Sequence, residues 1–216
     1  MHRVPKRRKK LNFFQSVIFG DTVFNERGRV YSSYYTSYLI EKASKIWSQL
    51  FVCHKCFKPF VRAKDLEVHL RLLCRNFKTP GKVIYEESRD RRVLKFYEVD
   101  GKKHRKFCRN LSLFAKFWIN SKEVVYKVRP FLFYLLTVKR DHEHEERVVG
   151  YFSKLKSFVT DQIETRNLST ICVFPNHVRN GYGSFLVDLS YRLSVWQGKP
   201  GHPEGPVSND GQALYD

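Results

Sequence analysis

Three cysteines and one histidine have the types and the spacing of zinc ligands. Cys53 and Cys56 form a Cys-x-x-Cys knuckle, and His69 and Cys74 follow about one helical turn apart on a predicted helix. Both thiolates of such a knuckle can reach one ion, and four protein ligands close a tetrahedral zinc site without an open position for water. The sequence therefore predicts a structural zinc module over residues 51–74.

A DNA-reading zinc finger would place similar residues on its helix. Lys64, Glu67 and Arg71 lie on the predicted helix of this module, where side chains of such fingers contact bases or phosphates. The chain has one finger and no array, and a larger domain follows it at once. These features favour a finger that folds the module.

A second group of residues could bind phosphate. Residues 179–184 read Arg-Asn-Gly-Tyr-Gly-Ser, a basic turn with glycines at 181 and 183. Glycine lets the backbone approach a ligand closely, and the first amides of a following helix bind phosphate oxygens. Arg179 adds positive charge. An ordinary glycine turn has the same pattern, so the loop alone leaves both interpretations open.

The segments around this turn predict the elements that position it. Residues 168–174 are apolar and β-branched, which is typical of a buried strand, and Pro175 ends that strand. Apolar residues recur at helical spacing over residues 184–196. The order is therefore strand, glycine loop, helix.

Further elements are expected in the middle of the chain. Residues 109–119 predict a helix, residues 124–128, 131–138 and 150–154 predict strands, and Asp100-Gly101 predicts a hairpin turn after the strand at residues 97–99. A cluster at residues 142–145 contains two histidines and two glutamates. We interpret it as a solvated hairpin tip and not as a metal site, because nothing in the sequence orders those ligands.

Composition limits the class of protein. The chain has 216 residues, 42% hydrophobic and 15% aromatic, so one good core is expected. No apolar run has membrane length and no signal peptide is evident, which favours an intracellular protein. The formal net charge of +19 favours a polyanionic partner. The basic run at residues 1–10 suits nuclear import or a DNA-contacting arm, and a merely solvated tail is the alternative.

The segment from Asn167 to Ser194 resembles the acetyl-CoA-binding segment of the MYST family of histone acetyltransferases. The residues that match the family pattern are Asn167, Leu168, Ile171, Pro175, Arg179, Gly181, Tyr182, Gly183, Phe185, Leu186, Ser190, Tyr191, Leu193 and Ser194. The chain departs at Thr170, Val178, Asn180 and Ser184, where the family has Cys, Gln, Arg and Lys. These departures remove polar groups on the pyrophosphate side of the cofactor.

The resemblance implies a fold and a domain organisation. The fold is expected to be α/β (α+β), a GNAT-like mixed twisted sheet with flanking helices, preceded by a small zinc-finger module. The expected division is a basic arm at 1–10, an N-terminal segment with the zinc finger at 11–79, and an acetyl-CoA-binding catalytic core at 80–216. Compared with the family, that core is expected to be incomplete at the C-terminus.

The resemblance also assigns roles to residues. Glu204 lies where the family has its general base, and Lys122 matches a lysine that is autoacetylated. The cofactor contacts implied are Ile171, Cys172, Val173, Arg179, Asn180, Gly181, Tyr182, Gly183, Ser184 and Ser208. The metal ligands agree with the Cys-Cys-His-Cys set derived from spacing.

The function implied is histone lysine N-acetylation in the nucleus, in chromatin regulation or silencing. Acetyl-CoA is the expected co-substrate and zinc the expected structural ion. The expected partners are a core-histone tail, nucleosomal DNA and subunits of a chromatin complex, with no membrane. Alternatives are a non-catalytic zinc-finger protein that binds nucleic acid or chromatin, a truncated inactive acetyltransferase, and a GNAT-type enzyme acting on a small amine.

Overall fold

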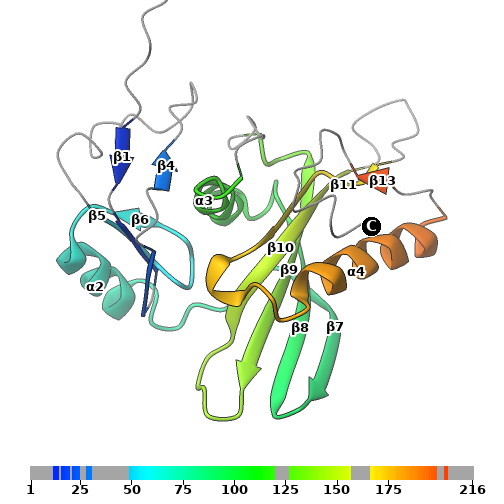
Figure 1. The fold of residues 1–216 in the computed structure, drawn as a ribbon, viewed down its shortest axis with the longest axis horizontal. Coiled ribbons are helices and arrows are strands. Elements are labelled where there is room, and N and C mark those ends of the chain that lie inside the picture. The colour runs from blue at the N-terminus through cyan, green and yellow to red at the C-terminus, as the bar shows by residue number, and fades with distance from the viewer. Residues whose placement is uncertain are drawn as a thin grey trace, which may run out of the picture.

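The structure is a computed structural model that describes residues 12–14, 16–19, 21–24, 28–30, 49–119, 127–156, 166–198 and 202–203 (Figure 1). The first half contains β1 (Asn12–Phe14), β2 (Ser16–Phe19), β3 (Thr22–Phe24), β4 (Gly28–Val30), β5 (Gln49–Val52), β6 (Pro59–Phe60), α2 (Ala63–Leu72), β7 (Lys82–Arg89), β8 (Arg92–Asp100) and α3 (Arg105–Ala115). The second half contains β9 (Phe131–Arg140), β10 (Arg147–Leu155), β11 (Arg166–Leu168), β12 (Thr170–Val173), the 3-10 turn η2 (Pro175–His177), α4 (Tyr182–Trp196) and β13 (His202–Pro203).

The largest sheet has five strands in the order β12-β10-β9-β8-β7. All its pairings are antiparallel. Parallel pairing occurs elsewhere, between β2 and β5 and between β11 and β13. With helices beside the sheet and a cysteine-rich module before it, the predicted α+β class is confirmed.

The two faces of the large sheet carry separate apolar cores, because successive strand residues point to opposite sides. On one face, Leu135 and Tyr151 pack with Leu111 and Phe114 of α3. On the other face, Tyr134 and Phe152 pack with Leu186 of α4. Figure 1 shows α4 lying across the sheet, with α3 between the sheet and the N-terminal module.

The N-terminal module shares the α3-side core. Its four-stranded sheet has the order β3-β2-β5-β6, and α2 follows β6. Val17, Leu50, Val52 and Phe57 from this module are each about 1% exposed and belong to the same cluster as α3. The module is therefore packed on the large sheet by a continuous apolar contact.

The hairpin predicted at Asp100-Gly101 is wrong. Asp100 ends β8, and its carboxylate accepts hydrogen bonds from the amides of Lys102 (2.6 Å) and Lys103 (3.3 Å). The backbone amide of His104 then donates to the Asp100 carbonyl at 2.8 Å. Because β7 and β9 occupy both edges of β8, no further strand can pair with it, and the chain turns into α3.

The helix predicted at residues 109–119 is displaced by four residues, because α3 runs from Arg105 to Ala115. Its expected apolar side is confirmed, since Leu111, Phe114 and Ala115 are buried. Trp118 lies beyond the helix end, with its ring centroid 4.8 Å from that of Phe114.

The other expected strands agree with the structure to differing degrees. β9 and β10 contain the ranges 131–138 and 150–154. The strand expected at 168–174 is divided by a bend at Ser169 into β11 and β12. Of the strand expected at 124–128, residues 124–126 lie outside the described residues, and Lys127 and Val128 are not in a strand.

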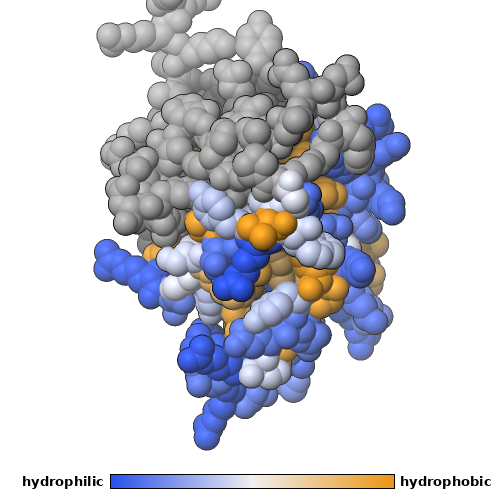
Figure 2. All heavy atoms as spheres, turned by 90° about the vertical axis from the view of Figure 1, so that its right-hand side faces the viewer, coloured by the Kyte–Doolittle hydropathy of each residue, from blue (hydrophilic) through white to orange (hydrophobic). Residues whose placement is uncertain are grey.

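Figure 2 views the molecule from the side of β7 and the end of α4, where apolar side chains are visible among polar ones. β7 is an edge strand, and Val83 and Tyr85 are 38% and 39% exposed. Trp196, the last residue of α4, is 84% exposed. In the part of the chain that the structure describes, every helix is too short or too polar to span a bilayer.

Candidate functional site

The four predicted zinc ligands come together in space. Their sulfur and nitrogen atoms all lie within 4.8 Å of one another. The Sγ of Cys56 lies 3.2 Å from Nε2 of His69, and the sulfurs of Cys53 and Cys74 are 3.8 Å apart. No other group of three or more such ligands occurs among the described residues, so the His142–Glu145 region at the exposed hairpin tip is not a metal cluster there.

Local structure explains this convergence. Cys53 and Cys56 lie in the turn after β5, which closes through hydrogen bonds from Cys53 N to Lys58 O (3.0 Å) and from Phe57 N to Cys53 O (2.9 Å). His69 lies in α2, and Cys74 follows the helix end, where its amide donates to the His69 carbonyl at 2.9 Å. The knuckle and the helix thus present their ligands to one point.

The ionisation of the three thiols suits a dication. A hydrogen bond from Cys56 lowers the pKa of Cys53 to about 4, and the same hydrogen bond raises the pKa of Cys56. Burial raises the pKa of Cys74 to about 11. The protein alone therefore stabilises one thiolate and opposes a second and a third. A dication bound by all three removes that opposition.

The fourth ligand is oriented by packing. The His69 ring lies with its centroid 5.0 Å from that of Phe60, and the side chain is 7% exposed. Its Nδ1 atom is buried and has no hydrogen-bond partner in the described part of the chain. The Nε2 atom is the one that faces the thiols, so it is the nitrogen available to the ion. Four protein ligands leave no open position, which makes the site suited to a structural ion.

The predicted strand, glycine loop and helix form a continuous unit. β12 pairs with β10, and the amide of Phe174 extends this pairing by donating to Val149 O at 2.9 Å. The 3-10 turn η2 then leads to Arg179 and Gly181, whose φ angles are +60° and +77°. Both residues are in the left-handed region, which glycine adopts without strain. α4 begins at Tyr182.

The start of α4 has the geometry of an anion site. The first α-helical hydrogen bond at this end runs from Phe185 N to Gly181 O (3.1 Å), so the amides of residues 182–184 precede the helical ladder. A Cβ placed on Gly181 would have no heavy atom within 4 Å, so open space adjoins the loop. Exposed Arg179 lies at the same turn. Residues and space therefore fit the pyrophosphate of acetyl-CoA.

Asn180 and Ser184 differ in their roles at this loop. The Asn180 amide nitrogen donates to the carbonyls of His177 (3.1 Å) and Val178 (3.0 Å), so this side chain fixes the turn. Ser184 is exposed on the first turn of α4. The loop conformation is thus held by a side chain in the position where the MYST pattern has arginine.

The strand β12 presents backbone amides at the open edge of the sheet. Because Phe174 N donates toward β10 and amide directions alternate along a strand, the amides of Ile171 and Val173 point away from β10. By the same alternation the Cys172 amide points toward β10. The Cys172 side chain is buried in the α3-side core, and burial raises the pKa of its thiol to about 12.

Three predicted site residues, Lys122, Glu204 and Ser208, lie outside the described residues, as does the basic arm at 1–10. β13 pairs in parallel with β11, which places Pro203, the residue before Glu204, beside Leu168. Leu168 is two residues before Thr170 on the path into β12.

Sequence reasoning missed two residues that shape this site. A Cβ on Gly150 would lie 2.7 Å from Cys172 O and 3.4 Å from Leu186 Cδ1, so only glycine lets β10, β12 and α4 approach this closely. Glycine inside a strand pattern is a recognised signal for such an approach. Phe57 is the second, and its contact with Phe174 has no signal in the sequence.

Comparison with known proteins gives consistent matches. Residues 78–216 match the model of the MOZ/SAS family. The chain is 39% identical over 173 residues to histone acetyltransferase SAS3 of Saccharomyces cerevisiae, covering 77% of the chain and 20% of that relative. It is 35% identical over 182 residues to histone acetyltransferase ESA1 of Candida albicans, covering 84% and 31%.

A human relative matches in the same way. The chain is 38% identical over 167 residues to histone acetyltransferase KAT6B of Homo sapiens, covering 77% of the chain and 8% of that relative. The matched part therefore spans less than a third of the length of each of these relatives.

Proposed function

Because the chain belongs to the MOZ/SAS family, we propose that it is the acetyl-CoA-binding core of a histone lysine N-acetyltransferase. The observation that carries this proposal is the loop between β12 and α4. It combines a left-handed Gly181 next to open space, an exposed Arg179 and the N-terminal amides of a 15-residue helix. The relatives named histone acetyltransferase support a histone-tail lysine as the acceptor.

Different residues of the chain bind different parts of acetyl-CoA. Acetyl-CoA supplies the acetyl group as a thioester. Arg179 and the amides of residues 182–184 hold its pyrophosphate, and the side chain of Tyr182 is buried in the same apolar cluster as Leu186. The outward amides of Ile171 and Val173 are hydrogen-bond donors of the kind that stabilise a developing oxyanion.

Glu204 is proposed to move the proton. A lysine amine has a pKa of about 10.4, so it must lose a proton before or during attack on the thioester. Glu204 is the carboxylate assigned to this step, and Ser208 is a further cofactor contact. The pairing of Pro203 with Leu168 supports this assignment, because Pro203 directly precedes Glu204 in the sequence and lies beside the strand that leads into β12. Lys122 is proposed as the autoacetylated lysine.

The zinc ion is proposed to be structural. Cys53, Cys56, His69 and Cys74 would hold it, and its role is to fix the knuckle and α2 against the large sheet. We further propose that the protein acts in the nucleus, on nucleosomes whose DNA attracts its net charge of +19, within a complex of chromatin subunits.

An acetyl-CoA titration followed by a histone-tail assay tests the function. Acetyl-CoA should raise the melting temperature in a concentration-dependent way, as a ligand that binds only the folded state does. The protein should then transfer acetyl to a histone-tail peptide. If acetyl-CoA changed neither the melting temperature nor the calorimetric signal, the non-catalytic chromatin-binding alternative would replace this proposal.

A further inference from the structure

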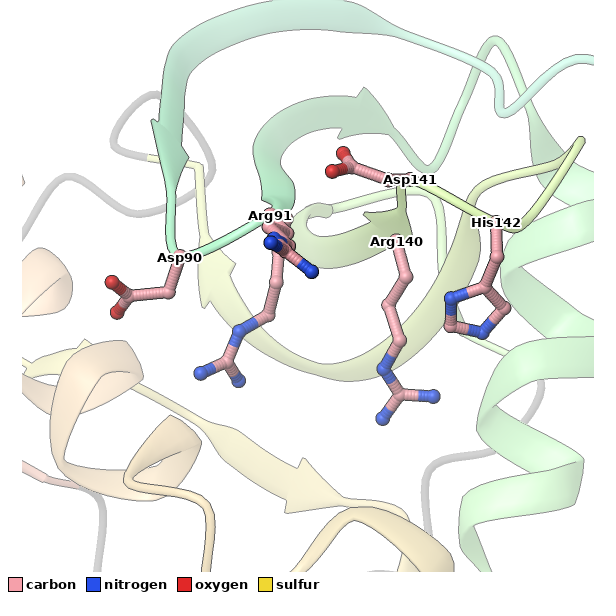
Figure 3. A pocket seen from close by; sticks show the side chains of 6 residues that line it. Asp90, Arg91, Arg140, Asp141 and His142 are labelled. Atoms are coloured by element: carbon pink, nitrogen blue, oxygen red, sulfur yellow. The ribbon is translucent and has the colours of Figure 1, made fainter.

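A hollow of about 420 Å³ lies at the ends of two hairpins (Figure 3). One wall is the β7–β8 turn, with Asp90 and Arg91, and the other is the end of β9, with Arg140. The remaining lining residues are Arg92, Asp141 and His142. With three arginines and two aspartates, the lining of the hollow has a net positive charge.

The backbone around the three arginines is fixed by the strand ends and by a tight turn. Asp90 and Arg91 have φ angles of +50° and +59°, which are typical of a tight two-residue hairpin turn. The amide of Asp141 donates to the carbonyl of Arg91 at 3.2 Å and so ties the two hairpins together. Figure 3 shows Arg91, Arg140 and His142 extending in the same direction, whereas the Asp141 carboxylate points away from the Arg140 guanidinium.

The charge arrangement costs stability. Arg92 lies directly opposite Arg140 in the antiparallel ladder, and like charges in that position repel. Arg140 is paired with Glu143, but its Nη1 is 3.6 Å from a carboxylate that Arg147 shares at the same distance. Within the described part of the chain, no carboxylate forms an ion pair with Arg91 or Arg92. A bound dianion would relieve this repulsion.

Guanidinium groups match phosphate oxygens in geometry, since each can donate two parallel hydrogen bonds. The lining contains no Phe, Tyr or Trp on which a base could stack, so a free nucleotide would be recognised only through its phosphates. The hollow opens at the tips of projecting hairpins, where a long polyanion can approach. A net charge of +19 favours such a partner.

We propose that this arginine hollow binds a backbone phosphate of duplex DNA. The proposal deepens the nucleosomal partner of the proposed function and assigns it a surface made by Arg91, Arg92 and Arg140. Phosphate contacts carry no base information, so the contact is independent of DNA sequence. The residues of this surface belong to the large sheet and its hairpin turns, and not to the basic arm at residues 1–10.

The test compares two double variants in titrations of a short DNA duplex at several salt concentrations. R91Q/R92Q removes two charges from the hollow. R62Q/R192Q removes one charge just before α2 and one from α4, where both arginines are exposed and paired with aspartates. Each phosphate contact contributes about 0.9 to the slope of log affinity against log salt. We expect the hollow variant to lose about 1 to 2 in slope and the control variant to stay near the wild type.

Equal slopes in both double variants would overturn the proposal, because only net charge would then matter. Binding of tripolyphosphate is a second measurement. If tripolyphosphate bound tightly to the wild type and not to R91Q/R92Q, while DNA slopes were unchanged, the hollow would serve a small phosphate ligand and the DNA assignment would be wrong. Acetyl-CoA affinity of the same proteins is measured in parallel. A wild type that binds DNA through the hollow but not acetyl-CoA would reject the proposed function alone.

Discussion

The ring of Phe57 in the zinc knuckle lies 5.7 Å from the ring of Phe174, the last residue before the turn that leads to the glycine loop. Phe57 follows Cys56 directly and has a φ of +61°, so the knuckle itself directs this side chain into the core. Phe114 of α3 lies 5.5 Å from Phe57 and 5.0 Å from Phe174. The aromatic cluster therefore joins the metal module to the start of the cofactor loop.

Replacing Phe57 should weaken acetyl-CoA binding while zinc remains bound. F57L leaves a void beside Phe174, and we expect a roughly tenfold loss of affinity, equivalent to about 1.4 kcal/mol. Calorimetry and zinc analysis on the same protein measure both quantities. F77L is the matched control, because Phe77 stacks on Phe107 at 6.0 Å, whereas Phe57 contacts Phe174 directly. Equal affinity in F57L and F77L would refute a positioning role for Phe57.

Gly181 should be indispensable for acetyl-CoA binding because a side chain would fill the space where phosphate approaches the amides. G181E is expected to abolish binding in a calorimetric titration. Gly198 at the other end of α4 also has a positive φ (+64°) and no atom within 4 Å of a built Cβ. G198E therefore carries a similar backbone strain and should retain affinity. Retained affinity in G181E would mean that the loop is only a turn.

Removing one zinc ligand should release the ion and loosen the module. C56S replaces a thiolate with a hydroxyl, and we expect zinc content well below one per chain by elemental analysis, with a lower melting temperature. C108S is a useful comparison, because Cys108 is a buried cysteine of α3 outside the ligand set. A folded C56S protein with full zinc content would contradict the assignment.

Catalysis should proceed by direct attack, with Glu204 as the base. E204Q should lower turnover by about 10²–10⁴-fold at neutral pH, with partial recovery as pH rises and the amine loses its proton unaided. A covalent route through Cys172 is disfavoured, because its thiol is buried with a pKa raised to about 12. It also lies roughly 6.7 Å along the strand from Thr170, the position where many MYST proteins have cysteine.

C172A should therefore keep most activity. Steady-state assays of C172A and E204Q across pH separate the two routes. Mass spectrometry provides the opposing test. An acetylated Cys172 that passed its acetyl group to a histone peptide would show that direct attack is wrong.

Asp100 should stabilise the fold except in acid. Burial raises the pKa of its carboxyl. The Lys156 ammonium, 2.6 Å away, and the amides of Lys102 and Lys103 lower the pKa, and their combined effect is larger, so the net shift is downward. A carboxyl with a lowered pKa contributes stability above its unfolded pKa of about 3.9 and loses that contribution as pH falls through the folded value. D100N should therefore unfold more easily at pH 7, and the difference from wild type should shrink below about pH 4. Urea titrations of D100N and wild type, at pH 7 and below about pH 4, measure this difference in the free energy of unfolding.

Sequence patterns predicted the parts of the site whose geometry is local. The ligands Cys53 and Cys56 lie in one turn, and His69 and Cys74 at one helix end, so spacing alone brings them together. The turn from η2 to α4 is similarly short, and its glycines and helix start were predictable. The MYST resemblance added the roles of Glu204 and Lys122, which remain predictions.

Contacts between distant elements were not predictable from pattern. The Asp100-Gly101 pair has hairpin chemistry, yet β8 already has neighbours on both edges, and this depends on the whole sheet. The tight approach at Gly150 depends on where α4 crosses β10. The contact of Phe57 with Phe174 depends on how the metal module packs on the sheet. Each of these is decided by tertiary packing.

The order of strands in the large sheet has a consequence for folding kinetics. β7 pairs with β8, β8 with β9, and β9 with β10, so these pairings join strands that follow one another along the chain, with only α3 and its flanking residues inserted. Short closures have a low entropic cost and form early. The metal module must instead dock through Phe57 onto a surface that includes Phe174, far along the chain. We therefore expect refolding to show a fast phase for the meander and a slower, zinc-dependent phase in which the cofactor loop acquires its final shape.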